Sequence, residues 1–370
     1  MEMKLKVALV FGTRPEAIKM ATLVKEIQSR KELEEITIVT AQHRQMLDSV
    51  LNLFGIKPDY DLNLMKENQN LWNLTSDILL STKKVLDEIS PDVVLVHGDT
   101  TTAFSASLSA FYSKIKVAHV EAGLRTFDKN YPFPEEINRV LADSVSDFHF
   151  APTKGAVDNL LNSGIKTKDT IFETGNTVID ALFYTLEHHK NVLDIDLNPN
   201  LKTILLTSHR RENFGEPLKN ICRAAIEISE KNKDIEIIYP VNPNPNVRTT
   251  VYQYLQNKER IKLVEPLDYA PFCNLMKKSH IILTDSGGIQ EEAPSLGVPV
   301  LVLRDETERP EALISGGVKL TGTNTKNIVQ NVQELLENKS LYKKVSNAIN
   351  PYGDGLASIR IADILIEKLS

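Results

Sequence analysis

The stretch VVLVHGDTTTAF, residues 93–104, decides the fold class. Its first five residues, Val93–His97, are mostly branched and apolar and predict a short buried strand, whereas the threonines after Asp99 predict the start of a helix. A strand that is apolar on both faces and leads directly into a helix is typical of a parallel sheet covered by helices. In an α/β fold of this kind, the same alternation should recur along the chain.

The alternation recurs in two series. In the first half we predict helices over 17–29 and 71–89, and strands over 6–11, 36–40, 93–97, 117–120, 148–151 and 170–173. In the second half we predict strands over 203–207, 235–239, 261–264, 281–284 and 300–303. The polar stretch 186–200 between the series is predicted to be a linker. The sequence thus predicts two doubly wound Rossmann-like domains, 1–185 and 195–354, with the active site in the cleft between them.

Length, charge and cysteine content set further limits. A chain of 370 residues is too long for one ordinary core and suits two domains. With 43 basic and 49 acidic side chains the formal charge is −6, so no nucleic-acid partner is predicted. Cys222 and Cys273 form neither a CxxC pair nor a metal-ligand spacing, which predicts no metal site, no structural disulfide and a reducing cytoplasm. We find neither a signal peptide nor an apolar run of about 18 residues, so we expect no membrane partner.

Two carboxylates follow predicted strands of the first half. Asp99 comes just after the strand 93–97, and Glu121 follows the strand 117–120 within HVEAGLR, residues 119–125. Parallel strands place their carboxyl ends on one edge of a sheet, so both acids can face one cleft. For Asp99 the alternative is an N-cap of the helix that starts at the threonines. A glycine-bounded loop rather than a helix follows Glu121, so capping explains that residue less well.

Other charged residues lie at predicted helix starts. Arg14 lies where GTRP turns a strand into a helix, beside free backbone N–H groups that suit phosphate, and Lys19 follows one turn later. A solvated basic turn is the alternative. In PEEINR, Glu135 lies in the first turn of a predicted helix. Dipole stabilisation, worth under about 1 kcal/mol, and a helical ion pair with Arg139 are the alternatives to a functional role there.

The second half offers groups that suit an anion. One strand ends in His209 with two arginines after it, and another is followed by the run Asp285–Gly288 before the next helix. The two glycines of this run let a backbone approach a phosphate closely, and Glu292 further along the helix is within reach of hydroxyl groups. A structural turn and a surface histidine are the alternatives. Carboxylates in one domain and anion-binding groups in the other together predict a nucleotide diphosphate ester as ligand.

Several long motifs are nearly specific to one family: FGTRPEAIKM, TAQHRQML, VLVHGDTTT, HVEAGLRT, PEEINR, TGNTVIDAL, SHRREN, LTDSGGIQEEAPSLGVPVLVLRDETERPE and NPYGDG. Running from about residue 6 to the last helix, they resemble the non-hydrolysing UDP-N-acetylglucosamine 2-epimerases. The resemblance implies a GT-B arrangement of the two domains, a C-terminal helix at 355–370 that crosses back onto the first domain, and a cytoplasmic homodimer.

The resemblance also implies an activity, the reversible epimerisation at C2 between UDP-GlcNAc and UDP-ManNAc. The product would supply ManNAc-type sugars for surface polysaccharide or glycan synthesis. The C2 proton is not acidic in the intact sugar. Anti elimination of UDP from C1 lets a carboxylate remove that proton and gives 2-acetamidoglucal, and syn re-addition of UDP then gives the epimer. This route implies no metal and no cofactor, and the chain has no GxGxxG fingerprint for a nicotinamide.

Matching the motifs residue by residue implies roles within this chain. The catalytic residues would be Asp99, Glu121, Glu135 and His209. The ligands of UDP, phosphate or ribose would be Arg14, Lys19, Arg139, His209, Ser286, Gly287, Gly288 and Glu292. A second, allosteric UDP-GlcNAc site would comprise Gln42, His43, Gln45, Arg210 and Asn242. Asn242 stands where many relatives have histidine, which leaves activation by UDP-GlcNAc open.

Three other functions stay open on the sequence alone. A GT-B glycosyltransferase would use the same UDP-binding groups but transfer the sugar to an acceptor. A hydrolysing 2-epimerase would release free ManNAc, and a nucleotide-sugar sensor would bind without turnover. The three carboxylates favour epimerisation, because neither a transferase nor a sensor needs all of them.

Overall fold

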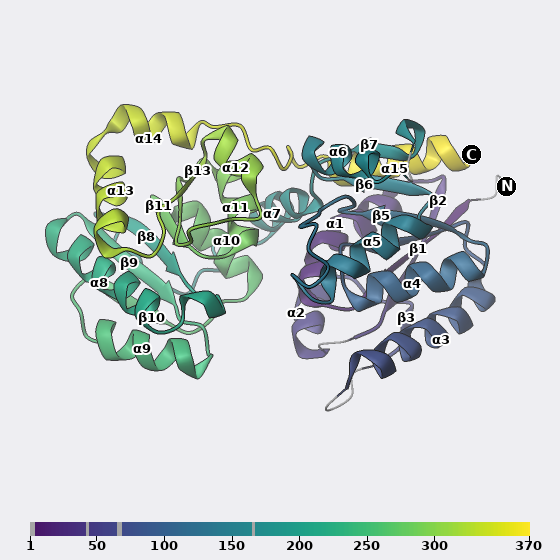
Figure 1. The fold of residues 1–370 in the computed structure, drawn as a ribbon, viewed down its shortest axis with the longest axis horizontal. Coiled ribbons are helices and arrows are strands. Elements are labelled where there is room, and N and C mark those ends of the chain that lie inside the picture. Colours follow the sequence, from purple (N-terminus) through teal and green to yellow (C-terminus); the bar gives the residue numbers. More distant parts are fainter. Residues whose placement is uncertain (1–3, 42–43, 65–68, 165–166) are drawn as a thin grey trace. The chain divides into compact units, whose positions relative to one another are not determined.

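The computed structural model describes residues 4–41, 44–64, 69–164 and 167–370. The chain divides into two compact units (Figure 1). Unit 1 is Met1–Tyr184 together with Tyr352–Ser370, and unit 2 is Thr185–Pro351. This division shows which residues pack together. That residues 1–185 with 355–370, and residues 195–354, fold as separate domains stays a prediction.

Unit 1 is built on one parallel sheet. Within the described residues this sheet has seven strands in the order β3-β2-β1-β4-β5-β6-β7. The strands are β1 (Leu5–Phe11), β2 (Leu33–Val39), β3 (Tyr60–Asp61), β4 (Val93–His97), β5 (Lys116–Val120), β6 (Phe148–Ala151) and β7 (Ile171–Glu173). All neighbouring strands run parallel, and the strand order reverses between β1 and β4. Such a reversal is where ligands bind in doubly wound sheets.

Helices pack in two groups around this sheet. One group joins α1 to α2 and α15, and the other joins α4 to α3 and α5. The helices are α1 (Arg14–Ser29), α2 (Arg44–Phe54), α3 (Leu71–Ile89), α4 (Thr101–Tyr112), α5 (Glu135–Val145), α6 (Lys154–Asn162), α7 (Thr177–His188) and α15 (Ala357–Leu369), with a 3-10 turn η1 (Lys168–Thr170). The five residues of β4 are all buried, and the first four, Val93–Val96, form an uninterrupted apolar run.

The start of α1 is set by a capping box. The Thr13 side chain accepts a hydrogen bond from the Glu16 backbone N–H, and Glu16 Oε2 accepts from the backbone N–H groups of Gly12 (3.1 Å) and Thr13 (2.8 Å). The helix therefore begins at Arg14, three residues before the predicted range 17–29, and Pro15 is its second residue.

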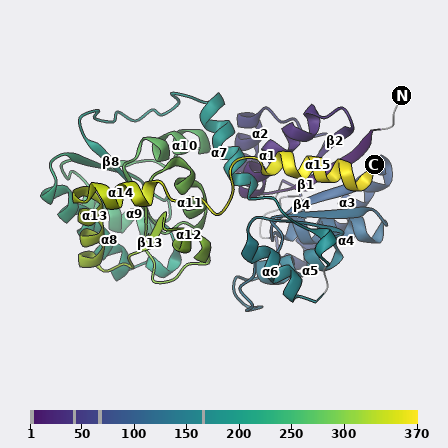
Figure 2. The same cartoon turned by 90° about the horizontal axis from the view of Figure 1, so that it is seen from above.

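The end of the chain belongs to unit 1, where α15 lies beside α1 (Figure 2). The Asp180 carboxylate on α7 accepts hydrogen bonds from the backbone N–H groups of Ala357 (3.2 Å) and Ser358 (2.7 Å). First-turn N–H groups have no partner within their own helix, so Asp180 caps α15 from another helix. The hydroxyl groups of Ser358 and Thr22 lie 3.1 Å apart and add a link to α1.

Unit 2 is a second parallel α/β unit. Within the described residues its sheet has six strands in the order β10-β9-β8-β11-β12-β13. They are β8 (Lys202–Thr207), β9 (Ile235–Pro240), β10 (Ile261–Val264), β11 (Ile281–Thr284), β12 (Val300–Val302) and β13 (Val318–Leu320). The helices are α8 (Glu216–Lys231), α9 (Pro245–Leu255), α10 (Tyr269–Lys278), α11 (Gly287–Glu292), α12 (Pro310–Ser315), α13 (Thr325–Glu337) and α14 (Lys339–Ser346), with 3-10 turns η2 (Arg211–Asn213) and η3 (Ala293–Leu296). One apolar core joins β8, β9, α8, α9 and α13.

The predicted fold class is confirmed, because both sheets are parallel and alternate with helices. The short strands β3 (two residues) and β13 (three residues) were not predicted. The predicted linker 186–200 is partly wrong, because α7 continues to His188. No helix in the described part of the chain combines the length and hydrophobicity that crossing a membrane requires.

Candidate active site

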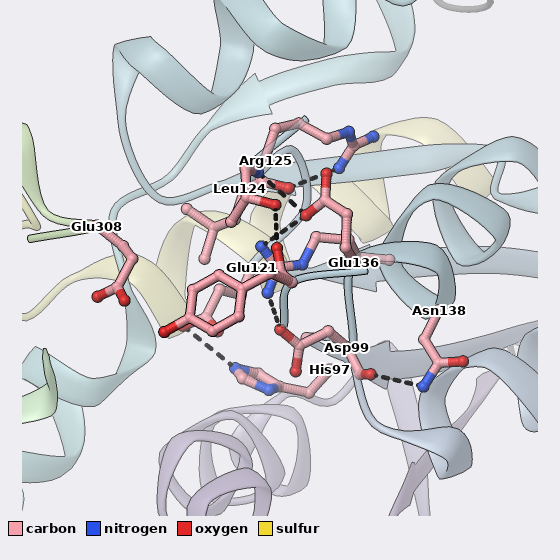
Figure 3. A network of polar contacts seen from close by, with 12 residues as sticks. His97, Asp99, Glu121, Leu124, Arg125, Glu136, Asn138 and Glu308 are labelled. Carbon is pink, nitrogen blue, oxygen red and sulfur yellow. Dashed lines mark hydrogen bonds and ion pairs between the residues drawn. The ribbon is translucent and has the colours of Figure 1, made fainter. Parts of the chain in front are cut away.

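Glu121 is the centre of a polar cluster at the carboxyl edge of the unit 1 sheet (Figure 3). It directly follows β5 and has a φ of 63°, a left-handed conformation that is uncommon outside glycine. Its Oε2 forms an ion pair with Lys19 Nζ from α1 and accepts a hydrogen bond from Asn176 Nδ2 at 2.8 Å. The structure thus brings Lys19, predicted as a ligand of UDP, into direct contact with a predicted catalytic carboxylate.

His97 ends β4 next to this cluster. Its Nε2 lies 3.9 Å from Glu121 Oε2, and the side chain is almost fully buried. Burial lowers the pKa of His97 to about 3, and the attraction of Glu121 does not offset this effect. A neutral imidazole therefore stands beside Glu121 at neutral pH.

Asp99 forms a second charged pair close by. Its carboxylate pairs with Arg139 on α5, and its backbone carbonyl accepts a hydrogen bond from Asn138 Nδ2 at 3.0 Å. Asp99 does not cap α4, because the cap is Thr100, whose side chain accepts from the Ala103 N–H at 3.0 Å. The alternative interpretation of Asp99 as an N-cap is therefore wrong.

The start of α5 differs from what the sequence suggested. Arg139 pairs with Asp99 and with Glu136, whose Oε2 is 3.3 Å from Arg139 Nη1, and not with Glu135. The Glu136 carboxylate also accepts the backbone N–H groups of Thr126 and Phe127, each at 3.0 Å. It therefore ties the loop after β5 to α5, a role that the sequence did not reveal. Glu135 is the half-buried first residue of α5.

A buried ionic layer lies beneath the two acids. His119 on β5 has its Nδ1 2.7 Å from Asp143 Oδ1 and its Nε2 2.6 Å from the backbone oxygen of Gly98. Arg125 Nη2 lies 2.5 Å from the other oxygen of Asp143. Burial alone would raise the pKa of Asp143, but His119 and Arg125 hold it well below its usual range. This layer fixes the Gly98 turn that connects His97 to Asp99.

Glu16 links the turns after β1 and β4. It accepts the Thr100 hydroxyl at 2.6 Å in addition to the backbone N–H groups of the α1 cap. Burial raises its pKa despite these hydrogen bonds. Arg14, a predicted ligand of UDP, is the partly buried first residue of α1 at this junction.

In unit 2, Asp285 organises the turn that carries His209. It directly follows β11 and accepts hydrogen bonds from Ser208 Oγ (2.8 Å), Asn213 Nδ2 (2.9 Å) and the backbone N–H groups of His209 and Arg210, each at 2.9 Å. Burial would raise its pKa, but these partners, His209 first, lower it to about 2. Its Oδ1 is 3.2 Å from His209 Nδ1, so the histidine is oriented although its side chain is 41% exposed.

The predicted diphosphate loop opens α11. Ser286 is the N-cap residue, and Gly287 and Gly288 are the first helical residues. A Cβ built on Gly287 would lie 3.6 Å from Arg210 Nη2 and 3.9 Å from Arg309 Nη2, so two guanidinium groups flank this glycine. Glu292, the predicted ribose ligand, ends α11 and accepts the Tyr269 hydroxyl at 3.0 Å.

The loop after β12 supplies charged residues that sequence reasoning missed. Arg304 pairs with Glu308 (2.9 Å) and Glu212 (2.5 Å), and Arg309 pairs with Glu291. Burial would raise the pKa of Glu308, but Arg304 lowers it to about 2. The motif RDETERPE, residues 304–311, was the available signal for these residues.

The predicted allosteric residues are only partly described. Gln42 and His43 lie outside the described residues. Gln45 is exposed on α2 in unit 1, whereas Asn242 follows β9 in unit 2 and accepts the Asn244 N–H at 2.9 Å. Among the described residues, Arg210 Nε is buried without a hydrogen-bond partner, and no group of three or more His, Cys, Asp and Glu side chains is arranged to hold a metal ion.

Known proteins similar to this chain identify its family. A family model described as UDP-N-acetylglucosamine 2-epimerase matches residues 25–366. The UDP-N-acetylglucosamine 2-epimerase of Bacillus subtilis (strain 168) is 54% identical over 363 residues, which cover 98% of this chain and 95% of the relative. The crystal structure of UDP-GlcNAc 2-epimerase from Neisseria meningitidis bound to UDP-GlcNAc has a TM-score of 0.90 at 50% identity, covering 98% of this chain and 100% of that one. The glycotransferase of kitacinnamycin, with a TM-score of 0.67 and 11% identity, shares the fold alone.

Two parallel, Rossmann-like α/β units give the chain the GT-B-like fold class of its structural neighbours. Within that class, the chain belongs to the UDP-N-acetylglucosamine 2-epimerase family and is an isomerase of that family. The resemblance that the sequence motifs indicated is confirmed.

Proposed function

We propose that the chain interconverts UDP-N-acetylglucosamine and UDP-N-acetylmannosamine by the non-hydrolysing route. The observation that carries the proposal is the pair of cation-bound carboxylates, Glu121 with Lys19 and Asp99 with Arg139, after the adjacent strands β5 and β4. Family membership and the UDP-GlcNAc bound to the similar Neisseria meningitidis structure support this choice of substrate.

The proposed chemistry needs proton transfer on both faces of the sugar at C2. When the C1–O bond breaks, the bonding electron pair leaves with UDP, and a carboxylate takes the C2 proton as the C1–C2 double bond forms. An acid then protonates C2 from the other face, and a UDP oxygen attacks C1. No proton is consumed over the cycle. Asp99, Glu121 and Glu135 are the proposed acid and base groups.

The cations beside the acids support this assignment. The ion pairs with Lys19 and Arg139 hold the two carboxylates in fixed positions, and a fixed position is what proton transfer at C2 requires. We assign UDP to His209, to the turn Ser286–Gly288, to Glu292 and to Arg14. The guanidinium groups of Arg210 and Arg309 beside Gly287 suit a diphosphate.

Proton NMR of UDP-GlcNAc in deuterium oxide tests the function directly. We expect deuterium at C2 and the appearance of UDP-ManNAc without free sugar. Free ManNAc would instead show hydrolysis, transfer to an acceptor would show a glycosyltransferase, and binding with an unchanged C2 hydrogen would show a sensor. Each of these three results would overturn the proposal.

Two variants test the carboxylates. We expect Glu121→Gln and Asp99→Asn to slow C2 exchange by at least about 100-fold, because removing one electrostatic partner of the transition state commonly costs about 3 kcal/mol. The matched control is Asp87→Asn, which removes an exposed lysine–carboxylate pair with Lys83 on α3. Wild-type exchange in Glu121→Gln would refute the assignment of that residue.

Activation by UDP-GlcNAc at a second site is a separate proposal. Arg210 carries an unpartnered buried Nε within the described residues, but Asn242 replaces the imidazole that many relatives have. Sigmoidal rates with UDP-ManNAc, relieved by traces of UDP-GlcNAc, are the expected result. Hyperbolic rates would remove this proposal without affecting the epimerase reaction.

We also propose a homodimer. Trp72 (86% exposed) and Leu80 (58%) lie about two turns apart on α3, and Phe111 (53%) and Tyr112 (68%) end the neighbouring α4. A second copy of the chain covering this apolar surface would remove it from water. Light scattering should show a dimer for the unmodified chain and a weakened dimer for Leu80→Glu. A monomer at all concentrations would contradict the proposal.

We place the reaction in the cytoplasm, where its product would enter surface polysaccharide or glycan synthesis. Cys222 and Cys273 are both unpaired and buried, which suits a reducing compartment. Fractionation of cells with antibodies against the chain tests this placement, and recovery outside the cytoplasm would contradict it.

A further inference from the structure

Asn176 lies in the motif TGNTVIDAL. None of the predicted site residues, and no step of the proposed chemistry, involves this motif. It immediately precedes α7 and is 3% exposed. We propose that Asn176 is a positioning residue that orients the Glu121 carboxylate for proton transfer, an inference that rests on the proposed epimerase function.

The hydrogen bonds of Asn176 define which way its amide faces. Oδ1 accepts the Val178 backbone N–H at 3.0 Å, so Nδ2 is the atom that faces Glu121 Oε2 at 2.8 Å. A flipped amide would set an oxygen against the carboxylate and leave the Val178 N–H without its acceptor. The amide can therefore only donate to Glu121, and it does so without adding charge.

The backbone of Asn176 is held by a distant part of the chain. Its N–H donates to the Tyr352 carbonyl at 2.7 Å. A Cβ built on Gly175 would lie 3.3 Å from Gly353 Cα, and one built on Gly353 would lie 3.5 Å from Asn176 N, so the two backbones are in close contact. The segment that leads into α15 thus supports Asn176, and Asn176 supports Glu121.

Glu121 needs this support because of its own backbone. Its left-handed φ of 63° is an unfavourable conformation for a residue with a side chain, and surrounding contacts must hold it. Lys19 and Asn176 both bind Oε2, one from α1 and the other from the start of α7. Rotation of the carboxylate would break one of these contacts. Lys19 contributes a positive charge beside the carboxylate, and Asn176 contributes a hydrogen bond from a different side.

Two substitutions separate orientation from folding. In Asn176→Ser the hydroxyl can still accept the Val178 N–H, but it is too short to reach Glu121. In Asn176→Asp the size and the cap are kept, and an acceptor replaces the donor beside Glu121. The control is Asn159→Ser, which removes a half-buried amide elsewhere in unit 1 that donates to the Gly123 carbonyl at 3.0 Å.

The kinetic expectation differs between the variants. For Asn176→Ser we expect kcat to fall about 10- to 100-fold with KM little changed, as for the loss of a hydrogen bond to a charged group. For Asn176→Asp we also expect the rising limb of the pH–rate profile to move to higher pH. The new carboxylate at position 176 disfavours ionisation of Glu121. Lys19 and His97 also face Glu121 and are unchanged in both variants.

The test measures C2 deuterium exchange and initial epimerisation rates of the full chain across about pH 4 to 9, a range that includes the ordinary titration of a glutamate, with melting temperatures in parallel. Rates of Asn176→Ser within about twofold of Asn159→Ser, or a pH profile of Asn176→Asp that matches the unmodified chain, would overturn the positioning role. If the unmodified chain shows no C2 exchange, the proposed function itself fails, which is a distinct result.

Discussion

Because His97 is buried, we expect the folding stability of unit 1 to decrease at acidic pH. The folded side chain has a pKa lowered to about 3, whereas an unfolded histidine titrates near the ordinary value of 6.5. Between these values the unfolded chain binds a proton that the folded chain does not, so stability falls as pH decreases from about 6.5. Of the titratable groups that face the His97 ring, Glu121 raises the pKa of His97, whereas Lys19 and His119 lower it.

The magnitude follows from the size of the pKa shift. Each pH unit below about 6.5 costs about 1.4 kcal/mol, so roughly 2 kcal/mol should be lost by pH 5 through this one residue. In His97→Asn this contribution is absent, while every other titrating group is retained. The variant is expected to be less stable at pH 7 because a smaller side chain leaves unfilled space, but its stability should fall about 2 kcal/mol less between pH 7 and pH 5.

Hydrogen exchange measured by mass spectrometry isolates this effect within the full chain. Peptides that cover β4 and β5, residues 93–120, report the free energy of opening after correction for the intrinsic pH dependence of exchange. The burial of Glu16, which raises its pKa and so acts in the opposite direction, is common to both proteins and cancels in the difference. If the two proteins lose opening free energy in parallel from pH 7 to pH 5, the assignment of a buried neutral imidazole is refuted.

Three further substitutions test how the fold is held. Asp180→Ala should lower the free energy of unfolding in urea by about 1 to 2 kcal/mol, because two buried N–H groups at the start of α15 lose their acceptor. An unchanged free energy of unfolding would argue against this cap. Gly123→Ala should fail to give a folded chain by circular dichroism, because φ is +86° and the new Cβ would lie 2.3 Å from the Ala156 carbonyl oxygen; a native melting curve would contradict that contact. Arg304→Met should lower stability by about 3 kcal/mol at pH 7 and by progressively less as the pH falls from 4.5 to about 2, the range over which the contribution of the Glu308 pair is lost. A pH-independent loss would show that the charge pair is not the cause.

The sequence predicted the strand ends well, because each is a local pattern. The strand before Asp99 was predicted at 93–97, as observed, and the strand before Glu121 began one residue late. A run of branched apolar residues that stops at a charged residue needs no knowledge of the rest of the chain. The positions of the candidate acids in the sheet were therefore accessible from residue order alone.

The partners of the acids were not accessible in this way. Lys19 and Glu121 are 102 residues apart, and Asp99 and Arg139 are 40 apart, so each pair exists only once the sheet has its strand order. The choice of Thr100 over Asp99 as the α4 cap is of the same kind. Both residue types cap helices well, and the contact between Asp99 and Arg139 is what distinguishes them.

The strand order also explains why the candidate acids need not come from one continuous segment of the chain. β4 lies between β1 and β5, so the turns after these three strands meet at one edge of the sheet. α1 starts at the first turn and carries Lys19, the second turn carries Asp99, and the third carries Glu121. Glu16 and His119 fix the turns to one another by binding Thr100 and the Gly98 carbonyl, respectively. Because these links are buried hydrogen bonds, a substitution in any one of them should misplace an acid that it never touches, and loss of activity without loss of substrate binding is its expected signature.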